Sequence, residues 1–389
     1  MTFLPPLAHF GDDVAFMRRY TDLIVLGDED GARLAVAPAW QGRVMTSSGG
    51  GEARASFGWI NRALIAARTV RPHINPVGGE DRFWLGPEGG QFSVFFAPGT
   101  RFQLADWHTP AAVDSLPWTV AGQSAHTVKL RTTFPLINYS GTRFDVLVDR
   151  EVRLLPSATA WDRLGVKPAP GVEIVAYESD NRLTNRGTAA WRRETGLLSI
   201  WIPGMFTASP ETTVVVPITA GPESQLGRKV TADYFGAVPA ERLQVTDEVV
   251  YFRGDGGWRS KIGISPRRSK GVLGSYDPAH ERLTIVQFSQ PAGATDYVNS
   301  LWQLQQDPYG GDAANSYNDG PPEDGSTPLG AFYELESSSP AAALAPGERL
   351  LHVHRTIHLS GPAAVLDETA RRCLGASLAA ITAALTAGR

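Results

Sequence analysis

The feature that most constrains the fold is a long series of short β-type segments with no regular helix between them. Examples are DLIVLGDEDGARLAVA (22–37), HTVKLRTTFPLI (126–137) and RLLHVHRTIHLSG (349–361). They combine period-two alternation with β-branched residues, and Gly, Pro, Asn and Asp separate them. The pattern disfavours alternating β–α units and predicts an all-β fold, a large antiparallel sandwich.

Two segments have helical character. Residues 11–21 (GDDVAFMRRYT) predict a short helix, and residues 362–388 predict a helix rich in Ala and Leu that begins at a proline and ends near a glycine. We therefore expect residues 1–361 to form one β domain and residues 362–389 to form a C-terminal helix packed on it.

Residues 306–330, dense in Gly, Pro, Asp and Asn, predict a long loop, which in compact domains is usually functional or disordered.

Composition excludes several classes of protein. The net charge is −4 and no basic tract is present, so nucleic acid is not an expected partner. No apolar run approaches the ~18 residues of a membrane-spanning helix. One cysteine excludes an internal disulfide framework and zinc sites built from several cysteines. The chain begins without a signal-peptide pattern, and both a cytoplasmic and a periplasmic location remain open.

The densest polar segment is HINPVGGEDRFWLGPEGG (73–90). Its paired glycines permit unusual backbone conformations or close approach to a ligand. Glu80, Asp81 and Arg82 could orient hydroxyl groups, and Trp84 offers an apolar face for a sugar ring. The alternative is a tight turn with a local ion pair and a core tryptophan.

Two carboxylates stand out in FYELESSSP (332–340). Glu334 and Glu336 are two residues apart, so on a strand they share one face, while Tyr333 and Leu335 point to the other. The shared face either lines a cleft or lies in solvent.

Three histidines occur in LLHVHRTIHL (350–359). His352, His354 and His358 share one face of a regular strand. They could act in acid–base chemistry, bind a metal together with ligands from elsewhere, or serve the structure alone. We expect no metal, because a strand spreads these three side chains along a line.

Cations and aromatic residues add further candidates. Lys261 and Arg267 belong to a basic cluster in WRSKIGISPRRSKG (258–271) that could hold an anionic substrate such as a uronic acid, or could be solvated. The ten tryptophans could stack on sugar rings, although a β-sandwich core explains most of them. No GxSxG, HExxH, P-loop or GxGxxG motif is present, which disfavours the common hydrolase, zinc-protease, kinase and dehydrogenase classes.

The segment ELESSSPAAALAPGERLLHVHRTIHL (334–359) resembles the C-terminal signature of aldose 1-epimerase (galactose mutarotase)-like proteins. In that signature an acidic residue on a strand precedes an L-x-P-G-E turn and a final strand, and Glu336 stands at the acidic position. FGWINR (57–62), which ends in Arg62, and NPVGGEDRFW (75–84) resemble the family's early segments. The stretch GGEDRFWLGPEGG is closest to bacterial branches of that superfamily.

The resemblance implies a β-supersandwich that binds carbohydrate in a cleft and needs no cofactor. A late glutamate acts there as base and a mid-chain histidine as acid. Glu336 would be the base, but residues 181–201 contain no histidine, so His354 or His73 would supply the acid. Arg62 and the polar residues named above would contact the sugar. The alternatives are a non-catalytic sugar-binding protein, and a glycoside hydrolase or polysaccharide lyase acting on an acidic glycan. The oligomeric state stays open.

Overall fold

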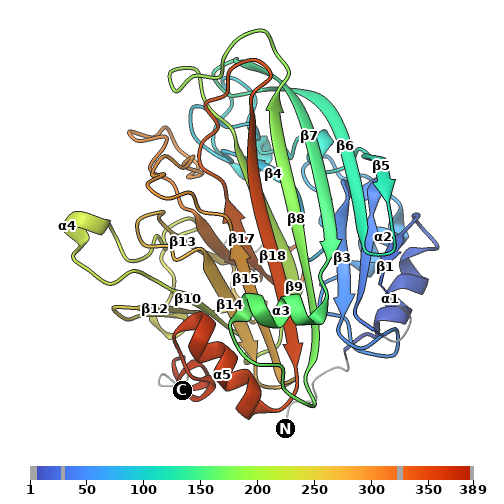
Figure 1. Ribbon diagram of the computed structural model, residues 1–389. Coiled ribbons are helices and arrows are strands. Elements are labelled where there is room, and N and C mark those ends of the chain that lie inside the picture. Colours follow the sequence, from blue (N-terminus) through green and yellow to red (C-terminus); the bar gives the residue numbers. More distant parts are fainter. Residues whose placement is uncertain (1–6, 28–30, 322–326, 386–389) are drawn as a thin grey trace.

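The computed structural model describes residues 7–27, 31–321 and 327–385, and within them the strands form three antiparallel sheets (Figure 1). The ten-stranded sheet contains, in spatial order, β11 (Leu243–Val245), β12 (Val249–Arg253), β10 (Thr213–Pro217), β14 (Val272–Asp277), β15 (Arg282–Phe288), β18 (Arg349–Ser360), β8 (Glu173–Asn185), β7 (Arg143–Leu154), β6 (Thr127–Ile137) and β5 (Thr119–Gln123). The five-stranded sheet contains β13 (Ser260–Ile264), β16 (Ala314–Asn318), β17 (Phe332–Ser338), β9 (Ser199–Thr207) and β4 (Trp84–Gly86). The smallest sheet contains β1 (Ile24–Leu26), β2 (Arg33–Ala37) and β3 (Arg43–Ser48).

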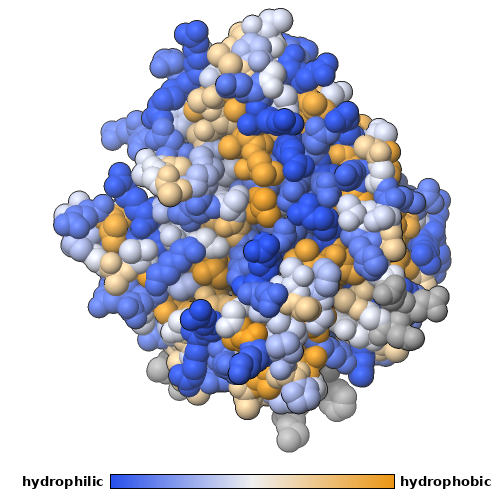
Figure 2. All heavy atoms as spheres, viewed as in Figure 1, coloured by the Kyte–Doolittle hydropathy of each residue, from blue (hydrophilic) through white to orange (hydrophobic). Residues whose placement is uncertain are grey.

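Strand β7 shows how the sequence pattern produces the sandwich. Its residues alternate strictly between buried and more exposed positions. Val146, Val148 and Val152 point into the core, whereas Asp149 and Arg153 lie on the opposite face among other charged side chains. This view of the molecule is correspondingly hydrophilic over much of its surface (Figure 2). The all-β, antiparallel prediction is confirmed.

The ten-stranded and five-stranded sheets pack face to face. One apolar cluster joins β6, β7 and β8 to β4 and β9, and a second joins β10, β12 and β14 to β13, β16 and β17. Alternation decides which side chains of β17 enter this core: Tyr333 and Leu335 do, as predicted. Phe332, Glu334 and Glu336 therefore point to the other face of the five-stranded sheet.

Short helices surround the sheets: α1 (Phe10–Met17), α2 (Arg62–Ala67), α3 (Ser157–Leu164) and α4 (Glu223–Leu226). The predicted C-terminal helix consists of two helices, α5 (Ala363–Leu374) and α6 (Leu378–Ala383). Gly375 separates them, because its φ of +70° ends α5, and the Ser377 side chain then caps α6. Buried residues of both helices pack on the outer face of β10, β14 and β15 (Figure 1).

The loop predicted for residues 306–330 is wrong in its centre, because β16 lies there and pairs with both β13 and β17. Its sequence, ANSYN, is polar, yet every residue is buried, since neighbouring strands satisfy its backbone groups. Residues 322–326 of that segment lie outside the described residues. None of the described helices is long and apolar enough to cross a membrane.

Candidate functional site

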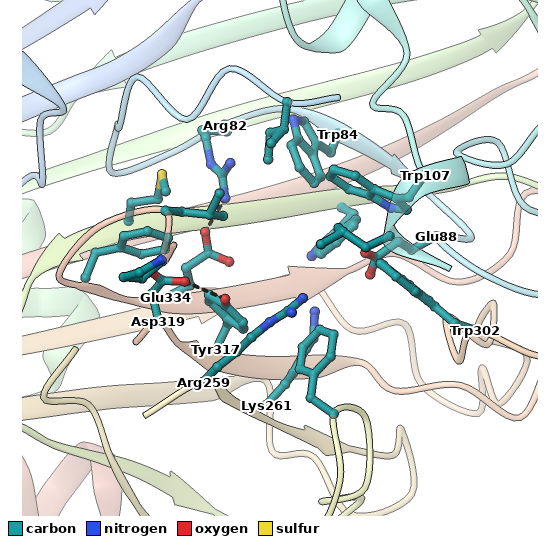
Figure 3. Close-up of a pocket in the computed structure, with 18 of the residues that line it drawn as sticks. Arg82, Trp84, Glu88, Trp107, Arg259, Lys261, Trp302, Tyr317, Asp319 and Glu334 are labelled. Atoms are coloured by element: carbon teal, nitrogen blue, oxygen red, sulfur yellow. Dashed lines mark hydrogen bonds and ion pairs between the residues drawn. The ribbon is translucent and has the colours of Figure 1, made fainter. Parts of the chain in front are cut away.

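A pocket of about 130 Å³ lies on the face of the five-stranded sheet that points away from the ten-stranded sheet (Figure 3). Every strand of the five-stranded sheet contributes a side chain to the base of the pocket. Loops that carry aromatic residues form its walls. The residues that line the pocket are Ile74, Arg82, Trp84, Glu88, Leu104, Trp107, Trp201, Met205, Phe235, Arg259, Lys261, Trp302, Tyr317, Asp319, Thr327, Pro328, Leu329, Phe332 and Glu334.

Glu334 is the central carboxyl group of the pocket. Arg82 forms an ion pair with it and also donates from Nε to the carbonyl oxygen of Pro203 at 3.1 Å. The guanidinium of Arg82 lies 4.8 Å from the centre of the Trp84 ring, which fixes its position further. Burial raises the pKa of Glu334 to about 8; Arg82 opposes this rise and the neighbouring Glu336 carboxylate adds to it. Glu334 therefore gains and loses its proton close to neutral pH.

Glu336 lies next to Glu334 on the same face of β17, directly beneath the pocket. Its Oε2 accepts hydrogen bonds from Trp201 Nε1 at 2.8 Å and from Lys261 Nζ at 3.0 Å. Its Oε1 is buried and has no hydrogen-bond partner among the described residues. Burial lowers the pKa of Lys261, but Glu336, Glu88 and Glu334 together outweigh this effect and raise it, so the lysine stays charged.

Four tryptophans provide the apolar surface of the pocket. Trp84 and Trp201 meet edge to face at 5.2 Å, and Trp107 stacks on Trp302 at 6.0 Å. Glu88 lies beside Trp302, opposite Glu334 (Figure 3). Burial raises the pKa of Glu88, and Lys261 counteracts only part of that rise. A flat apolar wall next to protonatable carboxyl groups suits a ring that carries hydroxyl groups.

The remaining polar groups lie on the side of the pocket formed by β13 and β16. The Tyr317 hydroxyl donates to Asp319 Oδ1 at 2.6 Å, and the Gly330 N–H donates to Asp319 Oδ2 at 2.8 Å. The Arg259 guanidinium lies over the Phe235 ring, 4.2 Å from its centre.

The structure brings together only part of the predicted site. Arg82, Trp84, Lys261 and Glu334 line the pocket, and Glu336 contacts two lining residues from below. Glu88, Trp107, Arg259, Trp302, Tyr317 and Asp319 also belong to it, although the sequence reasoning did not single them out as site residues. The tryptophans were a usable signal, but a sequence pattern does not distinguish a pocket wall from a core.

Glu80 and Asp81 point into the interior and not into the pocket. Both side chains are fully buried. Glu80 accepts from Ser47 and Tyr177 and also contacts His358, while Asp81 pairs with Arg150 at 2.6 Å.

The paired glycines, Gly78 and Gly79, allow their segment to pack closely against neighbouring backbone. Gly78 and Gly79 both have positive φ, +106° and +115°. A Cβ atom on Gly78 would lie 2.0 Å from the Trp59 carbonyl oxygen, so only glycine fits there. Gly78 lets this segment pass tightly beside residues 59 and 60, and Gly79 lies against residues 43 and 44.

The histidines of β18 lie between the two large sheets. His352 and His354 are both fully buried and both hydrogen-bond the Ser337 hydroxyl at 2.8 Å. Burial lowers the pKa of His352 to about 3 and that of His354 to about 4. Ser337 and Glu336 point to opposite faces of β17, so the structure does not bring His354 and Glu336 to one cavity.

Three further candidates lie outside the pocket. His73 is near its rim, where Nδ1 contacts the Trp107 carbonyl oxygen at 2.7 Å. Arg62 forms an ion pair with Asp13 on α1, and Arg267 lies exposed beside a separate surface depression. In the described part of the chain, no group of three or more His, Cys, Asp or Glu residues is arranged to hold a metal ion.

Solved structures share this architecture. A proposed aldose 1-epimerase from Escherichia coli K12 superimposes with a TM-score of 0.52 at 12% identity, covering 88% of this chain and 99% of that one. A protein of Synechocystis sp. PCC 6803 superimposes with a TM-score of 0.50 at 13% identity, covering 92% of this chain and 100% of the other. At such low identity the similarity shows the fold alone, which is galactose mutarotase-like, as the sequence resemblance implied.

No curated protein matches the chain significantly in sequence. A family profile, in contrast, matches it from residue 8 to residue 385. That match spans all three sheets and the C-terminal helices. The chain therefore belongs to the family of unknown function DUF6786.

Proposed function

We propose that this protein binds a sugar in the tryptophan-lined pocket and interconverts its anomers, as an aldose 1-epimerase-like enzyme. The observation that carries the proposal is Glu334. It is a carboxyl group with a pKa near neutral, at the surface of a pocket whose walls suit a sugar ring. A group that titrates near the working pH is well matched to proton transfer in both directions.

Interconversion of anomers requires two proton transfers. A base removes the proton of the anomeric hydroxyl, the bond between the anomeric carbon and the ring oxygen breaks, and an acid protonates the ring oxygen. The open aldehyde then rotates, and the reverse steps close the ring on its other face. We assign the base to Glu334 and the acid to Glu88, whose raised pKa favours its protonated form. Figure 3 supports this assignment, because the two carboxyl groups lie on opposite sides of the pocket.

Other residues position these two groups. Arg82 holds Glu334 in place by its ion pair, and the Lys261–Glu336 pair forms the charged base of the pocket. The carboxylate of Glu336, which the sequence resemblance proposed as base, is held by Trp201 and Lys261 below the pocket. We therefore place Glu336 as a positioning residue whose charge raises the pKa of Glu334.

Polarimetry tests the proposal. Fresh α-anomers of a panel of aldoses should equilibrate faster in proportion to the protein concentration. Glu334→Gln should lower that rate about 100-fold or more, the usual contribution of a positioned acid or base. Glu368→Gln, an exposed carboxyl on α5, is the matched control and should leave the rate unchanged.

A second candidate is a non-catalytic sugar-binding protein, which is favoured because the described residues that line the pocket include no histidine. Sugar binding that survives Glu334→Gln, without acceleration for any aldose in the panel, would support this candidate and refute the epimerase. Product release from a glycan panel would point instead to a hydrolase or a lyase.

A further inference from the structure

The pocket contains three cations, and two of them have a carboxylate of their own. Arg82 is paired with Glu334, and Lys261 is paired with Glu336. Within each pair the two opposite charges neutralise each other, so neither cation is free to hold an external anion.

Arg259, the third cation, has no such partner in the described part of the chain. Among the described residues it forms no ion pair and no hydrogen bond, and its Nε atom is buried without an acceptor. The charge of Arg259 influences two carboxyl groups of the pocket, Glu88 and Asp319, without an ion pair to either. Asp319 is already bound by Tyr317 and the Gly330 N–H. The guanidinium is half-buried against the Phe235 ring, which fixes its plane.

An unpaired guanidinium in a partly apolar pocket favours a specific kind of ligand. Its planar set of donors matches the two oxygens of a carboxylate, and a buried donor without an acceptor is costly until one arrives. A single free guanidinium balances one negative charge, which a carboxylate carries and a phosphate dianion exceeds. The carboxyl group of Glu88 would repel an anion only weakly, because burial raises its pKa.

We propose that the ligand is a sugar acid, a hexuronate whose carboxylate pairs with Arg259 while its ring lies against the tryptophans. This inference rests on the proposed function, since it names the substrate class of the same pocket. Arg259 then acts as the residue that selects a charged sugar over its neutral counterpart.

Calorimetric titration tests this selection. The probes are glucuronate, galacturonate and mannuronate, each compared with its own uncharged uronamide, with the parent hexose and with the hexose 6-phosphate. At least one uronate should bind ten-fold or more tightly than its uronamide, a preference of about 1.4 kcal/mol. Arg259→Gln should reduce uronate binding to the level of the uronamide and leave uronamide binding within about two-fold.

Two further variants make the test specific. Arg259→Lys keeps the charge but loses the planar fork, and should retain part of the preference. Arg349→Gln removes an exposed cation on β18, away from the pocket, and should change neither affinity. Circular dichroism of each variant establishes that it is folded.

The outcomes separate this inference from the proposed function. If uronates and uronamides bind equally, or if Arg259→Gln leaves the preference intact, the inference is overturned while sugar binding stands. Tighter binding of a hexose 6-phosphate than of every uronate overturns the carboxylate assignment. If no sugar of any kind binds, the proposed function fails, and this inference fails with it.

Discussion

The neutral histidines between the two sheets should make the stability of this protein depend on pH in a calculable way. In the folded chain His352 has a pKa of about 3 and His354 a pKa of about 4, against 6.5 for an ordinary histidine. Both pKa values are lowered by folding, so below pH 6.5 these two histidines bind protons in the unfolded chain but not in the folded chain. Stability contributed by these groups is fully present above pH 6.5 and is lost as the pH falls towards 4 and then 3.

The size of the effect follows from the shifts. At pH 5, about 1.5 units below the ordinary pKa, each histidine should cost about 2 kcal/mol of unfolding free energy, at 1.36 kcal/mol per unit. Acidic groups add their own pH dependence; for example, the raised pKa of Glu334 favours the folded state as the pH falls from 8. A comparison between two variants of the same chain removes these shared contributions.

The variant His352→Gln isolates one histidine, because glutamine can still bond the hydroxyl of Ser337 or Ser289. Urea unfolding at pH 7.5 and pH 5.0 should show that the variant loses about 2 kcal/mol less than the natural chain between these two values. His126→Gln, at an exposed position, is the control and should leave the loss unchanged. A variant that loses as much stability as the natural chain would refute the description of His352 as buried and neutral.

Three further predictions concern the pocket. The rate of anomer interconversion should rise from pH 6 towards pH 8 as Glu334 ionises, and a pH-independent rate in polarimetry would contradict its role as base. Lys261→Met leaves the Glu336 carboxylate buried and unpaired, and should cost about 3–5 kcal/mol in urea unfolding; the double variant Lys261→Met/Glu336→Leu should recover most of this loss. Trp302→Ala should weaken sugar binding by about 1 kcal/mol, roughly five-fold in calorimetry.

Alternation along single strands was predictable. It placed Glu334 and Glu336 on one face of a strand with Tyr333 and Leu335 on the other, and the structure confirms this. The same reasoning put His352, His354 and His358 on one face, where all three are in fact fully buried. A period of two is a local property, because each residue of an extended chain points opposite to its neighbour.

Predicting strands and helices from the sequence was less reliable where local composition and tertiary packing favour different structures. The polar residues of β16 look like part of a loop, yet they form a central strand because β13 and β17 lie on either side. The single helix expected near the C-terminus is divided at Gly375, where a glycine inside a helical pattern acts as a stop. Packing against neighbours overrides intrinsic preference in β16, whereas at Gly375 the intrinsic tolerance of glycine for positive φ ends the helix.

The sequence by itself determined the fold class and, in strands with clear alternation such as β17, which residues share a face. Only the tertiary structure decided which side chains share a cavity. Glu336 and His354 lie close along the chain but reach opposite sides of the five-stranded sheet, whereas Arg82 pairs with Glu334 across 252 positions. The physical reason is that a strand's own pattern fixes its two faces, while pairing with distant strands determines whether a face meets the core, solvent or a pocket.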